Sequence, residues 1–316
     1  MTQPSDPSQS PSGAPQCMRH PGRETWIRCQ RCERPICPDC MNQAAVGFQC
    51  PDCVAQGVKQ TRQGMLPFGG RASRDPRTVT IALIAINIAV FVLVRATGGL
   101  TSKLASALML TPVGSCSAVD GSGWYPSVTS GDLCTSYGLS WSPGFTDGAL
   151  WQILSHGFVH QEFLHIAMNL LALWVLGPNL ERVLGRSRFL AVYLVSVFVA
   201  GVTIMWFAEP YQSTLGASSG VFGLLGATLV LVWKVGGDVR SMAGLLAVNV
   251  AITLFVPNIS WQGHLGGFVG GALVALLMVL TPRGERRSTL QWSGVALLVV
   301  IAGALLVART AQLLPA

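Results

Sequence analysis

The sequence predicts an all-α integral membrane protein with a small cysteine-rich domain ahead of its membrane part. Half of the 316 residues are hydrophobic, only 11% are charged, and the mean hydropathy is +0.49. This composition is typical of a protein with several membrane spans. The apolar residues form runs long enough for helices that cross a bilayer. Seven of the nine cysteines precede the first of these runs, which indicates a separate N-terminal domain.

Residues 17–53 contain four pairs of ligand residues, and the two members of each pair are separated by two positions. Thiolate and imidazole pairs at this spacing are typical of tetrahedral Zn²⁺. Eight ligands are enough for two closed structural sites, so we expect two zinc ions without a catalytic role. The pairs are Cys17 and His20, Cys29 and Cys32, Cys37 and Cys40, and Cys50 and Cys53.

This pattern resembles a B-box-like zinc finger, in which the first and third pairs bind one ion and the second and fourth pairs bind the other. The spacing alone leaves sequential pairing open. A disulfide cluster is disfavoured because a cytosolic compartment is reducing. On either side, residues 1–16 are rich in proline and serine and predict a disordered tail rather than a signal peptide, and residues 54–78 predict a basic linker beside anionic headgroups.

Seven apolar runs follow the linker and are predicted to be membrane spans. An odd number of spans places the two ends of the chain on opposite sides of the membrane. The predicted spans are 79–94, 158–176, 189–208, 215–233, 241–256, 261–280 and 291–308.

The basic residues predict the orientation of these spans. Of the 21 lysines and arginines, 18 lie before the first span or in alternate loops after it. Basic loops remain in the cytoplasm, so we expect a multi-pass protein of the cell membrane with a cytoplasmic N-terminus and an extracytoplasmic C-terminus. The net charge of +7 is therefore a signal of topology and does not indicate a nucleic-acid partner.

Residues 96–150 are predicted to form a long extracytoplasmic loop rich in glycine, proline, serine and aromatic residues. Aromatic residues are common at the membrane interface. Cys116 and Cys134 both fall in this loop. On the oxidising side of the membrane they are candidates for a disulfide, and two free thiols are the alternative.

The stretch 215–227 is the predicted place for chemistry, because Ser218 and Ser219 lie there where an apolar run begins. A hydroxyl at the start of a helix lies beside free N–H groups, which favour developing negative charge. Serine needs a base, and four histidines accompany the predicted spans. Glycines around Ser218 and His264 favour close approach of their two helices. The histidines are His156, His160, His165 and His264.

These motifs resemble the rhomboid intramembrane serine proteases, whose nucleophile lies in a G-x-S-G motif and whose base lies beside glycines two helices later. Gly216-Ala217-Ser218-Ser219 matches except that Ser219 replaces the last glycine. The resemblance makes Ser218 the nucleophile and His264 the general base. It extends from Val79 to Leu280 and implies a six-helix core, followed in 281–316 by a cytoplasmic loop and a seventh helix.

The family motif H-x-x-x-x-H-x-x-x-N is also present, as His160, His165 and Asn169. The resemblance assigns the side chains of His165 and Asn169, with the N–H of Ser218, to the oxyanion hole. It gives Gly216, Ser219, His160 and Phe222 supporting roles, with Phe222 packed against the base. Apart from Glu162 at an interface, no aspartate or glutamate lies inside a predicted span, so we expect a Ser–His dyad without a catalytic cofactor.

The resemblance implies an endopeptidase that cleaves transmembrane segments near the extracytoplasmic face. The expected partners are membrane proteins and lipids, and a cytosolic partner of the cysteine-rich domain stays open. One alternative is an inactive rhomboid-like protein that binds transmembrane helices without cutting them. Another is a transporter or haem carrier, which is disfavoured because the histidines gather at one face rather than through the bilayer.

Overall fold

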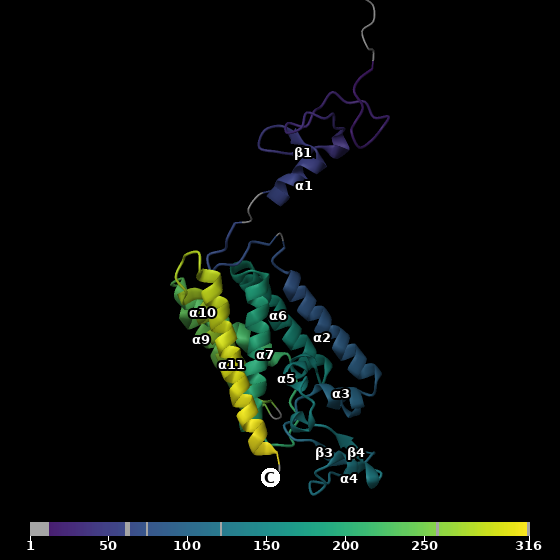
Figure 1. The fold of residues 1–316 in the computed structure, drawn as a ribbon, viewed down its shortest axis with the longest axis vertical. Coiled ribbons are helices and arrows are strands. Elements are labelled where there is room, and N and C mark those ends of the chain that lie inside the picture. Colours follow the sequence, from purple (N-terminus) through teal and green to yellow (C-terminus); the bar gives the residue numbers. More distant parts are fainter. Residues whose placement is uncertain (1–12, 61–63, 74, 121, 257–258, 315–316) are drawn as a thin grey trace, which may run out of the picture. The chain divides into compact units, whose positions relative to one another are not determined.

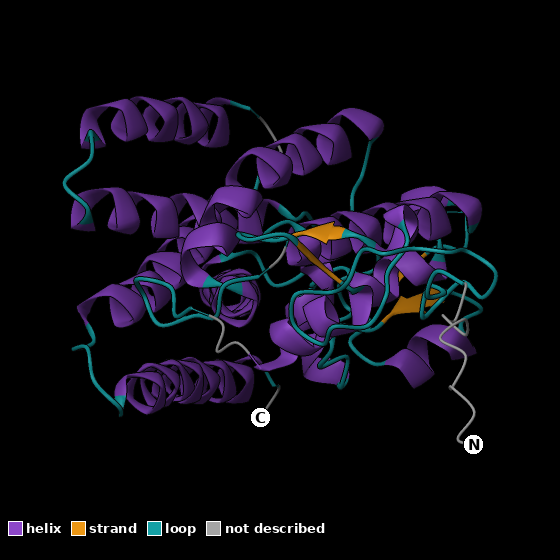
Figure 2. Cartoon of the chain, turned by 90° about the horizontal axis from the view of Figure 1, so that it is seen from above, coloured by secondary structure: helices purple, strands orange, loops and turns teal. Residues whose placement is uncertain are grey.

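The computed structural model describes residues 13–60, 64–73, 75–120, 122–256 and 259–314. Most of the predicted tail 1–16 therefore lies outside the described residues. The chain divides into two units, one that ends at Gly64 and one that begins at Met65. Helices make up most of the chain, and its strands are short (Figure 2).

The first unit contains the cysteine-rich segment. Its fold consists mostly of turns around the cysteines, with few regular elements. The helix at its end continues through Gln60, beyond the predicted boundary at residue 53. The elements are a 3₁₀ turn at Pro38–Cys40, the antiparallel strands β1 Asn42–Gln43 and β2 Phe48–Gln49, and the helix α1 Pro51–Gln60.

The second unit is a bundle of helices. Among the described residues, five helices are long and apolar enough to cross a membrane, namely α2, α6, α7, α10 and α11, and two shorter apolar helices, α8 and most of α9, accompany them. Figure 1 shows α2, α6, α7 and α11 side by side, with β3, β4 and α4 at the end of the bundle where α11 ends. The bounds are α2 Thr78–Ala96, α6 Phe163–Leu184, α7 Arg186–Phe207, α8 Ser218–Lys234, α9 Val239–Phe255, α10 Trp261–Leu280 and α11 Arg287–Leu313.

The second predicted span differs most from its helix. We expected 158–176, whereas α6 runs from Phe163 to Leu184. It starts later because His156–Phe158 form a separate 3₁₀ turn and Glu162 has an extended backbone. It ends later because the helix continues through Pro178, and burial of Leu184 favours the added turn. A proline removes one intrahelical bond without stopping a helix that tertiary contacts hold.

Helices α7, α8 and α10 form the centre of this unit. Large side chains such as Tyr193 and Phe189 of α7 are fully buried against α8 and α10. The expected close approach of α8 and α10 is present: a Cβ on Gly267 would lie 2.0 Å from the carbonyl oxygen of Ser219, and a Cβ on Gly271 would lie 2.0 Å from that of Gly223. Only glycine allows this backbone contact, which brings the two candidate motifs onto adjacent helices.

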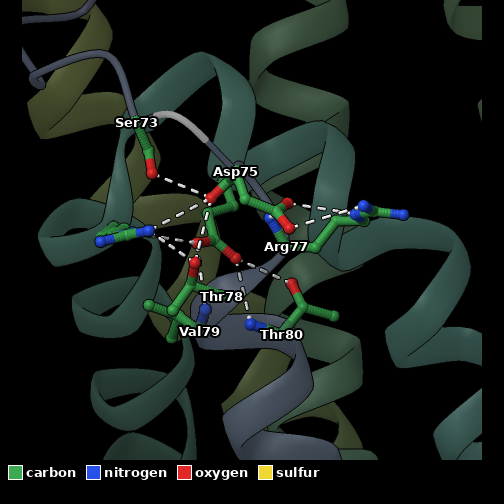
Figure 3. Close-up of polar contacts among 8 residues, drawn as sticks. Ser73, Asp75, Arg77, Thr78, Val79 and Thr80 are labelled. Atoms are coloured by element: carbon green, nitrogen blue, oxygen red, sulfur yellow. Dashed lines mark hydrogen bonds and ion pairs between the residues drawn. The ribbon is translucent and has the colours of Figure 1, made fainter. Parts of the chain in front are cut away.

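A carboxylate of α6 caps the start of α2. Glu181 is buried and accepts hydrogen bonds from the N–H groups of Val79 and Thr80, each at 3.0 Å. The close-up in Figure 3 shows these N–H groups in the first turn of α2. The cation near Glu181 is Arg186 at 3.9 Å, and the main partners of the carboxylate are backbone donors of another helix.

The segment between α2 and α6 has a structure of its own. Cys116 and Cys134 form a disulfide, and Gln152, which is fully buried, binds Ser106, Thr111 and Pro143 through its amide group. These contacts tie the loop together at four places. Its elements are η2 Gly99–Thr101, α3 Lys103–Leu108, β3 Ser115–Ser117, α4 Gly131–Ser136, β4 Ser140–Ser142 paired with β3, η3 Phe145–Asp147, α5 Gln152–Ser155 and η4 His156–Phe158.

Candidate active site and metal clusters

Ser218 is the first residue of α8 and is partly exposed. Two hydrogen bonds hold the backbone that leads to it. The N–H of Gly216 donates to the carbonyl of His156 at 2.9 Å, and the N–H of Ala217 donates to Nε2 of His160 at 3.4 Å. Gly216 has φ +132°, a backbone conformation that residues other than glycine rarely adopt. The serine is therefore presented at the start of a helix by a fixed turn.

Groups from α6 meet this turn. A Cβ on Gly216 would lie 3.0 Å from Nε2 of His165 and 3.3 Å from Oγ of Ser218, so the ring and the hydroxyl face the same small space. The rings of His160 and His165 contact edge to face, with centroids 5.1 Å apart. Asn169 is buried one turn further along α6, and one of its amide hydrogens is donated to the carbonyl of His165.

His264 lies in the first turn of α10 and is buried. The ring of Phe222 stacks on its imidazole, with centroids 3.9 Å apart and planes 15° apart. Phe222 is four residues after Ser218 on α8, so the two side chains lie on the same face of that helix. An apolar cavity of about 310 Å³ opens beside this pair of rings, between α8, α9 and α10.

The two serines have different neighbours. The hydroxyl of Ser218 shares the space beside Gly216 with Nε2 of His165, whereas Ser219 is buried and its Oγ would lie 3.4 Å from a Cβ on Gly263 of α10. Within the described part of the chain, no hydrogen bond joins Ser218 Oγ to the imidazole of His264; the ring instead bonds Thr253. The structure thus gathers the predicted site residues from α6, α8 and α10 at one end of the bundle without a direct Ser–His contact.

Sequence reasoning missed one neighbour of His264. Nδ1 of His264 lies 2.7 Å from the hydroxyl of Thr253 in α9. Nothing in the pattern of α9 marks Thr253, since serine and threonine are common in apolar helices and bond to their own backbone. Only the packing of α9 against α10 reveals this contact.

The ligand pairs of the first unit form two clusters. Within each cluster the ligand atoms all lie within 4.8 Å of one another. His20 Nδ1 is 3.2 Å from Cys37 Sγ, and Cys32 Sγ is 3.7 Å from Cys50 Sγ. These distances are close to the spacing of ~3.7 Å between the ligands of a tetrahedral zinc ion with Zn–S bonds of ~2.3 Å. The clusters are Cys17, His20, Cys37 and Cys40, and Cys29, Cys32, Cys50 and Cys53.

This grouping joins the first pair with the third and the second with the fourth, so the sequential alternative is not the one that the structure adopts. The environment favours the thiolate at Cys32, whereas burial raises the pKa of the Cys40 and Cys53 thiols. The guanidinium of Arg34 donates to Cys32 Sγ at 3.3 Å and holds the pKa of that thiol below its ordinary value. The donor set and spacing therefore fit structural zinc.

Known proteins match the membrane part of the chain. The Rhomboid domain matches residues 147–281. Rhomboid protease GluP of Bacillus subtilis (strain 168) is 30% identical over 161 residues, which cover 49% of this chain and 31% of that protein. Putative rhomboid protease YdcA of the same organism is 33% identical over 162 residues, which cover 49% of this chain and 78% of that protein.

Rhomboid-like protease 3 of Toxoplasma gondii is 30% identical over 142 residues, which cover 42% of this chain and 54% of that protein. The chain thus spans less than two thirds of the length of two of these three relatives. The matched domain contains the starts of α6, α8 and α10, where the candidate site residues lie. With YdcA matched over most of its length, the chain belongs to the rhomboid family.

Proposed function

We propose that this chain is an intramembrane serine endopeptidase in which Ser218 is the nucleophile and His264 the general base. One observation carries the proposal: Phe222, one turn after Ser218 on the same face of α8, stacks on the imidazole of His264. The base therefore lies against the face of α8 that begins with the serine. A change of side-chain rotamer at Ser218 is the motion that the proposal requires to bring the hydroxyl to the ring.

The mechanism follows from these roles. Nε2 of His264 takes the proton of Ser218 Oγ as this oxygen attacks the carbonyl carbon of a peptide bond. The oxyanion lies near the N–H of Ser218 and the side chains of His165 and Asn169. His264 then gives its proton to the leaving amine, and a water that it deprotonates hydrolyses the acyl-enzyme. No cofactor takes part in this proposed reaction.

The proposed substrates are transmembrane segments, cut near the extracytoplasmic face. The active site lies near the ends of α6, α8 and α10 that follow the loops with few basic residues, and we place these ends outside the cytoplasm. The proposal includes six core helices and a seventh after residue 280, in the cell membrane. The N-terminus is cytoplasmic in this arrangement and the C-terminus extracytoplasmic.

We also propose that the first unit is a B-box-like domain that binds two structural zinc ions. The proposal is supported by the two clusters of four ligand atoms and by their spacing. Each cluster has four protein ligands, so zinc bound there has no open position for a substrate. The ions would stabilise the fold of residues 17–53 and take no part in proteolysis.

Labelling with a serine-reactive activity probe tests the nucleophile and the base. The probe should label the full-length protein in detergent micelles, and labelling should fall to background in Ser218→Ala because the attacking oxygen is gone. His264→Ala should lower it by at least about 100-fold, since general-base catalysis contributes that much or more. Ser219→Ala, which changes the neighbouring hydroxyl, should retain labelling.

The alternative is an inactive rhomboid-like protein that binds transmembrane helices. Two observations favour it: Ser218 and His264 share no hydrogen bond among the described residues, and Ser219 occupies the place of a family glycine. It predicts no labelling of the wild-type protein and equal retention of a transmembrane peptide by wild type and Ser218→Ala. Labelling that survives in Ser218→Ala but not in Ser219→Ala would move the nucleophile to Ser219.

A further inference from the structure

The imidazole of His264 is held by two side chains. Phe222 covers its face, and the hydroxyl oxygen of Thr253 lies 2.7 Å from Nδ1. Both members of the second contact are buried. Serine hydrolases with a triad place a carboxylate at this nitrogen, and apart from Glu162 at an interface the predicted spans contain no aspartate or glutamate. Thr253 lies where that carboxylate would be.

Thr253 is an unusual residue for its helix. It is the one buried residue of α9 among those whose burial is described, and its neighbours Ile252, Leu254 and Phe255 are exposed. An apolar helix that faces lipid gains nothing by burying a hydroxyl unless the hydroxyl has partners. Here the partners are the imidazole and the backbone of α9 itself.

The single hydrogen of this hydroxyl determines whether its oxygen donates a hydrogen bond to the ring or accepts one from it. A threonine hydroxyl carries one hydrogen and has two lone pairs. Thr253 donates that hydrogen to the carbonyl of Asn249, one turn earlier, at 2.7 Å. It is therefore left as an acceptor toward His264. A neutral imidazole carries hydrogen on one nitrogen only, so this contact requires the hydrogen on Nδ1 and leaves Nε2 with a free lone pair.

We propose that Thr253 is a positioning residue that fixes His264 in the Nδ1–H tautomer and so presents Nε2 as the base toward Ser218. This inference rests on the proposed roles of Ser218 and His264 and makes the catalytic unit a set of three side chains, in which Thr253 orients His264 and takes no proton. The wrong tautomer would have a hydrogen on Nε2 and could not accept the serine proton. Thr253 also stabilises the imidazolium that forms, because its oxygen accepts from Nδ1–H throughout.

Steady-state cleavage of a transmembrane substrate by the full-length protein in liposomes measures the effect on rate. Thr253→Val keeps the shape of the side chain and removes the hydroxyl, and it should lower kcat about tenfold, the equivalent of about 1.4 kcal/mol, while KM stays within about twofold. Thr253→Ser restores the oxygen and should return kcat to within about twofold of wild type. A purely structural role would not give this rescue together with an unchanged KM.

The matched control is Thr228→Val. Thr228 of α8 bonds to the carbonyl of Leu224, also one turn earlier and at 2.7 Å, so it repeats the backbone bond of Thr253 without a histidine. This variant should leave kcat unchanged. An equal loss of kcat in Thr228→Val and Thr253→Val would overturn the proposal, because it would assign the effect to the helix rather than to the ring.

Nitrogen NMR of the histidine rings reads the tautomer without any catalysis. In ¹⁵N-histidine-labelled Ser218→Ala protein, with His264 assigned from a Ser218→Ala/His264→Ala sample, Nδ1 should carry the hydrogen and Nε2 should not. Adding Thr253→Val should populate the Nε2–H form. A ring protonated on Nε2 in the parent protein would overturn the proposal. The same tautomer with and without Thr253→Val would overturn it as well. If wild type cleaves nothing, the proposed function fails, and this measurement still decides the role of Thr253.

Discussion

Gly216 is the residue on which the position of Ser218 depends most directly. Its backbone conformation, φ +132°, directs the chain into α8, and the absence of a side chain leaves room for Nε2 of His165, which would lie 3.0 Å from a Cβ there. Both requirements exclude other residues. The first is a matter of backbone strain, and the second concerns the space where the oxyanion is proposed to form.

Gly216→Ala should therefore damage the site more than the fold. The strained backbone should cost about 1–3 kcal/mol of unfolding free energy, and the turn should relax by moving Ser218, so we expect substrate cleavage to fall by more than 100-fold. Thermal unfolding followed by circular dichroism and cleavage of the same substrate measure the two effects. Gly303→Ala is the control, because a Cβ on Gly303 of α11 meets nothing within 4 Å. Cleavage within twofold of wild type in Gly216→Ala would contradict this account.

The residues of the candidate site differ in how far the sequence predicts them. Ser218, His264, His165 and Asn169 lie in motifs with fixed spacing, so a resemblance was enough to select them. Thr253 was missed because its contact with His264 depends on how α9 packs against α10, and no spacing rule expresses that. Without the structure, the lack of a carboxylate indicated a dyad with nothing at Nδ1.

At the scale of helices, the cap on α2 is the clearest link between distant segments. The first N–H groups of a helix lack partners within it, and the carboxylate of Glu181 supplies partners for those of Val79 and Thr80. Its negative charge also interacts favourably with the positive end of the helix dipole. Because Glu181 is buried, water cannot replace it, and the contact joins the starting turn of α2 to the last turns of α6.

Glu181→Gln should lower the unfolding free energy by about 1–3 kcal/mol, the usual range for a hydrogen bond to a charged group. The side chain keeps its size, but one oxygen acceptor becomes a donor that faces N–H groups. The melting temperature in detergent should fall, while the rate of probe labelling at a temperature where the protein is folded should be unchanged. A loss of labelling without a loss of stability would instead indicate a role in the site.

Asp75→Asn is the matched control for this cap. The Arg77 guanidinium beside Asp75 holds the pKa of this exposed carboxyl below its ordinary value. A lowered pKa contributes stability above the ordinary pKa and loses it as the pH falls through the lowered one. Asp75→Asn should therefore have a small effect at neutral pH, because water screens an exposed ion pair.

Helix ends illustrate which parts of the fold the sequence could and could not predict. Apolar runs located every long helix, since burial in lipid or in the bundle requires them. The ends of α6 were displaced because they depend on tertiary contacts: Glu162 is extended where hydropathy continues, and Leu180 and Leu184 are buried beyond Pro178. A window of hydropathy contains no information on such partners.

At the scale of the whole molecule, the chain combines two units with different sources of stability. The helical unit buries large apolar side chains among α7, α8 and α10. The first unit has a core that consists largely of cysteines, and a segment this short lacks the apolar area for a stable core of its own. In such domains metal binding compensates for the small buried apolar area, because the free energy of zinc coordination contributes directly to the free energy of folding.

The interleaved pairing of the ligands and the sequential pairing predict opposite losses of zinc in two double variants. Cys17 and Cys37 belong to one cluster, whereas Cys17 and Cys29 belong to different ones. The full-length protein should contain two zinc ions by elemental analysis. Cys17→Ser/Cys37→Ser should lose one ion, because both substitutions damage the same site, and Cys17→Ser/Cys29→Ser should lose both.

Each double variant removes two thiolates, so the total number of ligands lost is matched and only their grouping differs. Sequential pairing would give the opposite result, since Cys17 and Cys29 would then share an ion. Probe labelling of Ser218 should stay unchanged in both variants, because the proposed chemistry uses no metal. If neither variant nor wild type contains zinc, the structural-zinc proposal fails; if labelling falls in step with zinc loss, the first unit controls the active site and is more than a separately stabilised fold.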